Sequence, residues 1–213
     1  MKKAVVLLSG GLDSTTTLYW AQAQGLECYG LIFNYGQKHL KEVNVAKNIA
    51  KLTKIEYKIV NLEFPWKGSA LLDDEIEIPK NREIDAEIPV TYVPARNIIF
   101  LSIAASYAEV IGASSILIGA NSVDYSGYPD CRPEFMRAMQ NVIDLGTKVG
   151  KIKIETPLIN LSKKDIILLG TKLGVPYEKT WSCYNGGDEP CGVCDSCVLR
   201  NKGFEEACSK NLK

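Results

Sequence analysis

The feature that most constrains the fold is a short apolar run that ends at two glycines and is followed at once by a helical pattern. Residues 5–8 are apolar, two of them β-branched, and predict a buried strand. After Gly10 and Gly11, apolar residues recur at helical spacing, and Asp13 or Ser14 is a suitable cap for that helix. The glycines therefore occupy a tight strand-to-helix turn.

A turn of this kind predicts an anion-binding site. Glycines let backbone N–H groups converge on an oxyanion, and the unpaired N–H groups and dipole of a helix N-terminus favour negative charge. Ser9, Ser14 and Thr15 add hydroxyl donors. The spacing fits neither GxxxxGK[ST] nor GxGxxG, so the two common nucleotide-binding fingerprints are absent. The alternative is an ordinary strand-to-helix turn, and we favour phosphate binding.

The composition is that of an ordinary globular protein, with 213 residues, 25 basic against 25 acidic side chains and 46% hydrophobic residues. This length allows one α/β domain, expected over residues 1–180, and a small C-terminal segment over residues 181–213. Zero net charge gives no general attraction to polyanions, so we expect no nucleic-acid partner. No apolar run has the length of a membrane span or a signal sequence, so we expect a cytoplasmic protein without membrane contact.

Strand and helix patterns alternate along the chain after the first helix. Strands are predicted over residues 28–34, 55–62, 115–121 and 152–159, and helices over residues 40–52, 97–111, 135–145 and 162–173. Repeated strand–helix steps predict an α/β fold, a doubly wound parallel sheet of five strands with helices on both faces. Ligands of such sheets bind at the carboxyl ends of the strands.

Residues 63–93 interrupt this rhythm with prolines and acidic runs. The segment is long for a loop in a compact domain. It is predicted to be either disordered in the free protein or a lid over the site, and a solvated charged loop is the alternative.

Several polar groups are predicted at the same end of the sheet as the glycine loop. Arg96 and Asn97 would place a guanidinium and a capping amide at a helix start. The loop over residues 124–132 carries two carboxylates, two phenols and an arginine, which favours ligand binding over a purely structural turn. Ser162 is a suitable N-cap, and the two lysines after it oppose the helix dipole. One of them is therefore a candidate for phosphate contact, although a solvated lysine is the commoner case.

Four cysteines near the C-terminus follow the spacing C-x7-C-x2-C-x2-C, at Cys183, Cys191, Cys194 and Cys197. Four thiolates suit tetrahedral zinc, although the last three would also fit an iron–sulfur cluster. We favour zinc because nothing else in the chain suggests redox chemistry. A closed four-ligand site predicts a structural zinc knuckle that ties the C-terminal segment to the sheet.

The remaining cysteines and the single histidine are less informative. Cys28 lies in a predicted strand and is expected to be an inert core thiol. Cys131 is either a reactive thiol of the ligand loop or a packing residue, and His39 is either a ligand contact or a helix-start residue. Cys208 has no assigned role.

These motifs together resemble one family. The SGGLDS stretch at 9–14 resembles the pyrophosphate loop of ATP pyrophosphatases, which cleave ATP between the α and β phosphates and adenylate a substrate. With it, the stretches YGQKH at 35–39, VPARN at 93–97, SGYPDCRPEF at 126–135, LSKKDI at 161–166 and PCGVCDSCVLR at 190–200 resemble the 7-cyano-7-deazaguanine synthases of queuosine biosynthesis. The likeness covers nearly the whole chain, apart from residues 65–91.

The resemblance implies a zinc-containing ligase with an adenine nucleotide hydrolase-like fold. It would use ATP and Mg²⁺ to convert 7-carboxy-7-deazaguanine and ammonia into the nitrile through an adenylated carboxylate and an amide. It also implies a homodimer. Release of AMP rather than ADP is inferred from the loop type, and the source of ammonia stays open.

The site residues implied by the resemblance form two groups. ATP is expected on Ser9, Gly10, Gly11, Leu12, Asp13, Ser14, Thr15 and Lys163, of which Asp13 and Lys163 are also expected to be catalytic. Asp13 would help to bind Mg²⁺. The substrate is expected on Arg96, Asp124, Tyr125, Asp130 and Arg132.

Three other functions are compatible with the loop. A tRNA-thiolating ATP pyrophosphatase would need a basic RNA-binding face or an extra domain. A synthetase making NAD or GMP would need a glutaminase region or free ammonia. A non-catalytic nucleotide sensor or zinc scaffold would bind ATP without turnover, which the combination of Ser9, Asp13 and Lys163 opposes.

Overall fold

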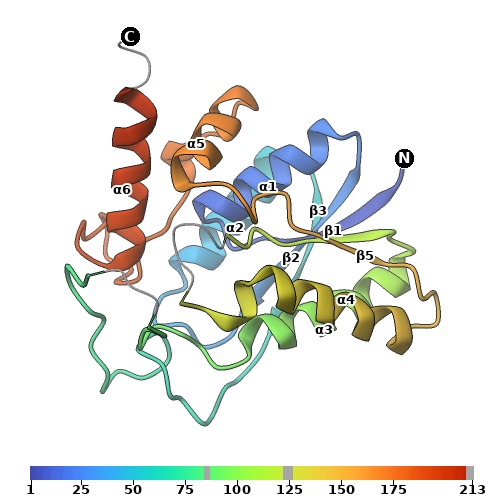
Figure 1. The fold of residues 1–213 in the computed structure, drawn as a ribbon, viewed down its shortest axis with the longest axis horizontal. Coiled ribbons are helices and arrows are strands. Elements are labelled where there is room, and N and C mark those ends of the chain that lie inside the picture. The colour runs from blue at the N-terminus through green and yellow to red at the C-terminus, as the bar shows by residue number, and fades with distance from the viewer. Residues whose placement is uncertain (84–86, 122–126, 210–213) are drawn as a thin grey trace.

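The core of the protein is one sheet of five parallel strands in the order β3-β2-β1-β4-β5 (Figure 1). The structure, a computed structural model, describes residues 1–83, 87–121 and 127–209. The strands are β1 (Lys3–Leu7), β2 (Glu27–Asn34), β3 (Glu56–Asn61), β4 (Ser115–Leu117) and β5 (Lys153–Glu155). The predicted doubly wound sheet is confirmed. Its order reverses between β1 and β4, which opens a crevice at their carboxyl ends.

Helices cover both faces of the sheet. The helices are α1 (Leu12–Ala23), α2 (Lys41–Leu52), α3 (Arg96–Ile111), α4 (Pro133–Gly146), α5 (Lys163–Lys172) and α6 (Asp195–Cys208), with short 3-10 turns η1 (Pro129–Cys131) and η2 (Tyr177–Lys179). Helices α1 and α2 pack on one face, α3 and α4 on the other, α5 beside α1, and α6 beside α5 (Figure 1). None of the described helices combines the length and apolar character that a membrane crossing requires.

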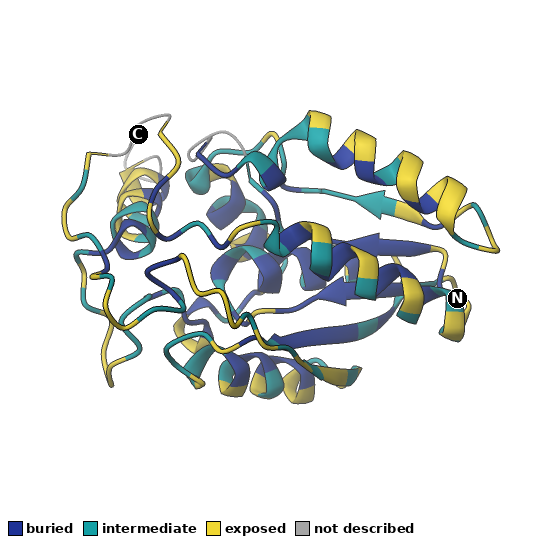
Figure 2. Cartoon of the chain, turned by 90° about the horizontal axis from the view of Figure 1, so that it is seen from below, coloured by how far each residue is buried: buried dark blue, intermediate teal, exposed yellow. Residues whose placement is uncertain are grey.

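Alternate strand residues supply the two halves of the core. Along β1, Val5 and Leu7 pack in the cluster that includes α3 and α4, whereas Ala4 and Val6 pack in the cluster that includes α1 and α2. Side chains alternate across a strand, so a strand buried on both faces must be apolar throughout. Figure 2 shows the inner strands in dark blue between helices whose outer faces are yellow, whereas the edge strands β3 and β5 are partly exposed.

Strands β4 and β5 are shorter than the apolar patterns predict. The chain leaves β4 after Leu117 and approaches the start of α1, where a Cβ added to Gly119 would lie 2.9 Å from the carbonyl carbon of Asp13. Strand β5 ends at Glu155, two residues before Pro157, which has no N–H to offer a neighbouring strand. The predicted strands over residues 115–121 and 152–159 are therefore too long, because the apolar runs continue into loops that pack beside the sheet.

The described part of segment 63–93 is a packed loop without helix or strand. Ala70, Leu71 and Ile78 are buried in the same cluster as α3 and α4. The Lys38 backbone N–H donates to the Leu71 carbonyl at 3.1 Å, and the Asn81 N–H donates to the Val193 carbonyl at 2.8 Å. A solvated charged loop is thus the wrong description of these residues, which bridge the loop after β2 and the C-terminal segment.

Replacing Gly119 by alanine should destabilise the protein by about 1–3 kcal/mol, because the added methyl meets the backbone at the start of α1. Urea denaturation would measure the free energy of unfolding. Gly146→Ala is the control, since an added Cβ there meets no atom within 4 Å, and alanine in a helix should stabilise by about 0.5–1 kcal/mol. Wild-type stability of Gly119→Ala would contradict the close approach.

Candidate functional site

A cavity of about 280 Å³ opens at the carboxyl ends of the central strands. Its walls come from the loop after β1, the loop after β2, the start of α3 and residues 181–184. A second cavity of about 200 Å³ adjoins it, and Asp13, Arg96 and Cys131 line both. The cavities lie where the switch in strand order predicts a ligand site.

The glycine loop between β1 and α1 forms one wall of the larger cavity. The expected cap by Asp13 or Ser14 is wrong, because Gly11 is the N-cap and no side chain caps the helix. The Ser14 hydroxyl instead turns back into the loop, where it accepts from the Ser9 N–H at 3.2 Å and lies 3.0 Å from the Ser9 hydroxyl. The N-terminal N–H groups of α1 are thus left without a side-chain cap, as an anion site requires.

Gly10 is the tightest position of this loop. Its φ of 77° is left-handed, and an added Cβ would lie 2.6 Å from the backbone nitrogen of Ala46 in α2. Both conditions select glycine, because an L-residue is strained at this φ and the methyl group would clash with backbone.

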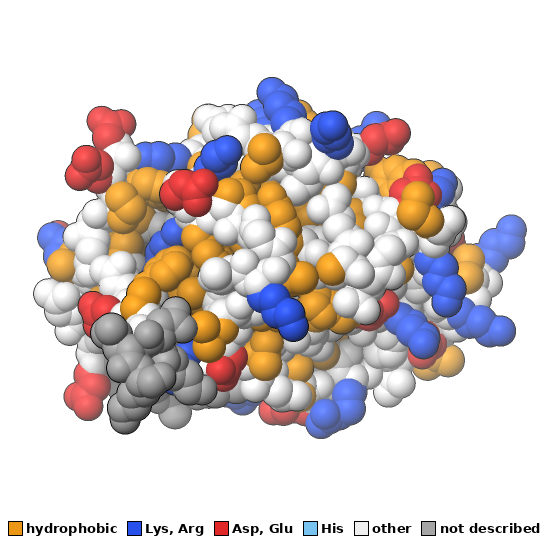
Figure 3. Space-filling model, turned by 90° about the horizontal axis from the view of Figure 1, so that it is seen from above, with side chains coloured by type: hydrophobic (Ala, Val, Ile, Leu, Met, Phe, Trp, Pro, Cys, Tyr) orange, Lys and Arg blue, Asp and Glu red, His pale blue; other side chains and the backbone are white. Residues whose placement is uncertain are grey.

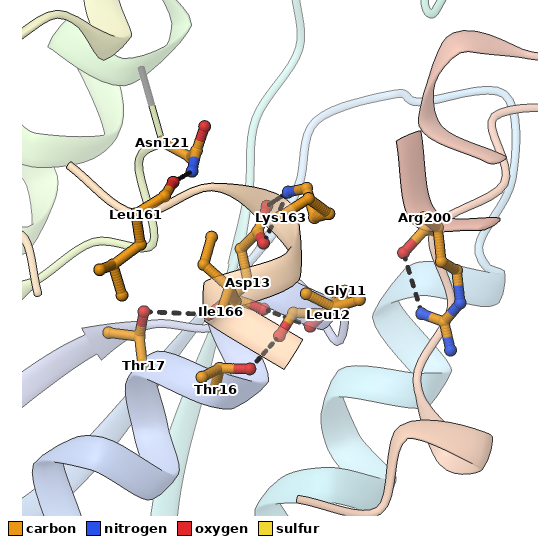
Figure 4. Close-up of polar contacts among 12 residues, drawn as sticks. Gly11, Leu12, Asp13, Thr16, Thr17, Asn121, Leu161, Lys163, Ile166 and Arg200 are labelled. Atoms are coloured by element: carbon orange, nitrogen blue, oxygen red, sulfur yellow. Dashed lines mark hydrogen bonds and ion pairs between the residues drawn. The ribbon is translucent and has the colours of Figure 1, made fainter. Parts of the chain in front are cut away.

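Asp13 and Lys163 form an ion pair at the edge of the second cavity. Lys163 Nζ donates to both carboxylate oxygens of Asp13 at 2.8 Å, and the two side chains are partly buried (Figure 4). Ser162 is the N-cap of α5 and accepts from the Asp165 N–H at 3.1 Å, as predicted. Gly203 of α6 packs against the Lys163 side chain, where a Cβ would lie 2.6 Å from Cγ. These contacts aim the lysine at the start of α1.

The start of α3 is capped by a residue distant in sequence. Its N-cap is Ala95, at a left-handed φ of 57°, so the predicted capping by the Asn97 amide is wrong. The Asn97 N–H donates to Asp130 Oδ2 at 2.9 Å, and the Asn97 amide donates to the Asp130 carbonyl at 3.1 Å and to Cys131 Sγ at 3.3 Å. The Asp130 carboxylate therefore satisfies the helix terminus, and this buried residue lines neither described cavity.

The predicted substrate residues lie in different places. Arg96 lines both cavities and donates from Nη1 to the Tyr35 hydroxyl at 3.2 Å. Its guanidinium is charged at any working pH. Arg132 immediately precedes α4 and is not among the described residues that line the cavities. Asp124 and Tyr125 lie outside the described residues.

The four predicted cysteines meet at one point. The sulfur atoms of Cys183, Cys191, Cys194 and Cys197 all lie within 4.8 Å of one another. Four ligands at the zinc–sulfur distance lie about 3.8 Å apart, so the cluster is compact enough for a single ion. Burial opposes ionisation of the Cys191 thiol, but N–H groups of Val193 and Cys194 lower its pKa to about 6. The group can hold a metal ion.

The cysteine cluster is built into the wall of the larger cavity. The backbone N–H of Trp181 donates to the Gly10 carbonyl at 3.0 Å. This bond joins the chain that enters the cluster to the glycine loop. Lys41 Nζ donates to the carbonyls of Gly187 and Asp188 at 2.6 and 2.7 Å and lies 3.6 Å from the centre of the Trp181 ring. Disturbing the cluster must therefore disturb the cavity.

Two residues left open by the sequence have defined surroundings. His39 lines the larger cavity, and Gly186 packs so closely on its ring that an added Cβ would overlap Cγ. Burial and the neighbouring Asp130 raise the pKa of the Cys131 thiol to about 12. Cys131 is therefore a neutral packing and hydrogen-bonding residue at neutral pH, not a nucleophile.

Sequence reasoning missed Glu42, which lines the larger cavity from the first turn of α2. Burial raises the pKa of its carboxyl to about 7, although the Arg96 guanidinium acts in the opposite direction. The sequence shows only an acidic residue at the start of an amphipathic helix. Its place in the cavity depends on how α2 packs on the sheet.

The fold and the cavity define an adenine nucleotide hydrolase-like α/β protein. A solved NMN synthetase from Francisella tularensis has a similar fold, with a TM-score of 0.51 and 14% identity over 97% of this chain and 86% of that one. The family model described as "Queuosine biosynthesis protein QueC" matches residues 3–208. The chain belongs to this family.

Relatives of similar length carry one name. A protein of Thermoplasma volcanium named 7-cyano-7-deazaguanine synthase is 57% identical over 97% of this chain and 88% of its own length. A protein of the same name from Trichodesmium erythraeum is 55% identical over 96% of both chains.

Replacing Cys194 by alanine should remove bound metal and lower the melting temperature by roughly 10 °C, because three thiols no longer close a tetrahedral site. Metal analysis and thermal unfolding of the purified protein would measure both effects. Cys208→Ala is the control, since Cys208 is exposed and outside the cluster. Retention of one metal equivalent by Cys194→Ala would exclude the four-thiolate site.

Iodoacetamide at pH 8 should label Cys208 in the folded protein and leave Cys131 unlabelled until urea is added. A raised pKa keeps the Cys131 thiol protonated, and the thiolate is the reactive form. Peptide mass spectrometry would give the labelling of each cysteine. Rapid native labelling of Cys131 would show that its thiol is accessible and ionised.

Proposed function

We propose that the chain is an ATP-dependent 7-cyano-7-deazaguanine synthase that converts 7-carboxy-7-deazaguanine and ammonia into the nitrile. The observation that carries this proposal is the 53–57% identity, over nearly the whole chain, to relatives named for that product. The cavity at the switch in strand order supports it, because it offers both a phosphate-binding loop and charged side chains for a small molecule.

The proposed ATP site is the glycine loop and the start of α1. Residues Ser9, Gly10, Gly11, Leu12, Asp13, Ser14 and Thr15 would hold the pyrophosphate with backbone N–H groups and hydroxyls, and Lys163 would contact a phosphate oxygen. Mg²⁺, when bound, would offset phosphate charge, and the Asp13 carboxylate is an oxygen ligand of the kind this ion takes. Ligand binding then requires the Asp13–Lys163 pair to open, which releases a carboxylate for the cation and an ammonium group for the phosphate.

The proposed substrate site centres on Arg96. Its guanidinium lines both cavities and can bind a carboxylate with two parallel hydrogen bonds. Asp130 is proposed to position Arg96 and not to contact the substrate, because its carboxylate accepts a hydrogen bond from the start of the helix that carries Arg96. Arg132, Asp124 and Tyr125 remain proposals for the same substrate.

The chemistry follows from the poor reactivity of a carboxylate. One carboxylate oxygen attacks the α-phosphorus of ATP, and pyrophosphate leaves. Ammonia then adds to the carbonyl carbon, AMP departs with that oxygen, and loss of protons gives the amide. A second ATP activates the amide oxygen in the same way, and loss of AMP and the remaining N–H protons leaves the nitrile. Lys163 is proposed to stabilise the charge that develops on the phosphates.

The cysteine cluster is proposed to hold structural zinc. An iron–sulfur cluster interposes several atoms between its cysteines, whereas these four sulfurs are close enough for one ion. Zinc, when bound, would fix the wall of the cavity without an open position for substrate. Free cysteine thiols also favour a reducing compartment, so the protein is proposed to be cytoplasmic. The homodimer and the boundary at residue 180 are further parts of this proposal.

The face of the molecule seen in Figure 3 gives no support to a tRNA-modifying function. Basic and acidic side chains are interspersed over the face seen in Figure 3, and the chain has no net charge. A protein that neutralises an RNA backbone usually gathers its basic residues into a patch.

Mass spectrometry of the protein incubated with ATP, Mg²⁺, ammonium and 7-carboxy-7-deazaguanine tests the function. The expected products are the nitrile and AMP. Nitrile with ADP would keep the activity and overturn the adenylation chemistry. Absence of nitrile from metal-loaded, ATP-binding protein would overturn the proposal.

Asp13→Asn and Lys163→Met should each lower nitrile formation by about 10²–10³-fold, because each removes one charge at the proposed phosphate site. Both variants should stay folded and metal-loaded, since the pair is partly exposed and neither residue belongs to the cysteine cluster. Lys164→Met is the matched control, being the neighbouring lysine of the same helix turn. Equal losses in Lys163→Met and Lys164→Met would refute a specific role for Lys163.

A further inference from the structure

The larger cavity contains a second carboxyl group whose role is unassigned. Two described carboxyls line this cavity, Asp13 and Glu42. Asp13 is neutralised by Lys163, with both oxygens at 2.8 Å. Glu42 has no such partner, because among the described residues none forms a hydrogen bond or an ion pair with its carboxylate.

The surroundings of Glu42 make its ionised form costly. Apolar side chains such as Val43, Leu71 and Phe100 line the cavity with it, beside charged side chains such as Lys38 and Arg96. Arg96 favours the carboxylate, but burial outweighs it and raises the pKa of Glu42 to about 7. A carboxyl in this state can both accept and release a proton near neutral pH, as a general base must.

The proposed reaction needs such a group. Ammonia is largely protonated at neutral pH, and ammonium has no electron pair with which to attack a carbonyl carbon. An ammonium ion that leaves water for a confined cavity that already holds Lys38 and Arg96 also needs an anionic partner. In the described cavity, the carboxyl that is not already paired is Glu42.

We propose that Glu42 is the ammonium-binding residue and general base of this enzyme, a role that rests on the proposed function. The Glu42 carboxylate holds ammonium in the cavity and takes one of its protons. The freed electron pair of ammonia forms the C–N bond as AMP leaves from the activated carboxyl carbon, and the second proton is lost from the adduct. Glu42 then returns its proton to solvent.

Other ionisable groups around Glu42 fit this role less well. Besides cysteines, the groups that line the cavity with it are Asp13, Tyr35, Lys38, His39, Arg96 and Tyr184. Lys38 and Arg96 are cations, and the Tyr35 phenol has its pKa raised by burial. His39 could accept a proton but cannot attract a cation when neutral, and its ring is packed against Gly186.

The test compares Glu42→Gln with Glu134→Gln, a matched control that also removes a carboxylate from the first turn of a helix but at an exposed site outside both cavities. Nitrile formation is measured against ammonium chloride, ATP and 7-carboxy-7-deazaguanine at pH 7 and pH 9. Glu42→Gln should raise the KM for ammonium at least tenfold at pH 7 and leave the KM of the carboxylate substrate unchanged. The defect should shrink at pH 9, because free ammonia needs neither a counter-charge nor a base.

The melting temperature, measured as a function of pH, tests whether Glu42→Gln is folded. A carboxyl whose pKa rises from 4.5 to about 7 on folding lowers stability as pH increases through that window. Wild-type protein and Glu134→Gln should therefore lose stability from pH 4.5 to 7 relative to Glu42→Gln, as measured by melting temperature.

Three results would overturn the inference. A raised KM for 7-carboxy-7-deazaguanine with an unchanged KM for ammonium would make Glu42 a contact to the purine-like ring. Wild-type kinetics of Glu42→Gln would show that Glu42 has no role in ammonium binding or proton transfer. Absence of nitrile from wild-type protein would remove the proposed function and this role with it, a result distinct from the other two.

Discussion

The architecture depends on the close approach of three stretches of backbone at the carboxyl end of β1. Gly10 lies against the backbone of α2, and Gly119 lies against the backbone at the start of α1. In a close-packed interior such contacts leave no room for even one methyl group. They bring the glycine loop, the end of β4 and the start of α2 together, so that Asp13, Arg96 and Glu42 line one cavity although they come from different helices.

The sequence predicts features that are encoded locally. The order of elements, the glycine turn, the Ser162 cap and the four-cysteine site all rest on short-range periodicity or spacing. Prediction from the sequence fails where a residue distant in the chain determines the local structure. Asn97 is a sound cap by type, yet the carboxylate of Asp130, 33 residues away, occupies that place. The ends of β4 and β5 fail likewise, because apolar residues continue into loops whose packing no local pattern reveals.

The candidate site shows the same division. Lys163 could be suspected from its unfavourable place in a helix first turn, and the structure brings it to Asp13. Glu42 also lies in the first turn of a helix, where an acidic side chain is favourable. Its position in the sequence therefore gives no sign of a functional role. The packing of the described part of segment 63–93 is equally hidden from sequence reasoning, because its charged composition masks the buried apolar residues Ala70, Leu71 and Ile78.

The two carboxyls of the cavity differ in state because their neighbours differ. Asp13 is paired with the Lys163 ammonium group, so a ligand that takes Lys163 from it must supply a cation in return. In the proposed function this would couple binding of ATP phosphate to binding of Mg²⁺, since neither charge is favourable alone in a partly buried site. Glu42 has no such ion-pair partner among the described residues, and burial raises the pKa of its carboxyl to about 7 although the Arg96 guanidinium acts in the opposite direction. One cavity thus contains a paired charge, which the proposed adenylation step would use to bind phosphate, and a titrating carboxyl, which the proposed amination step would use to move a proton.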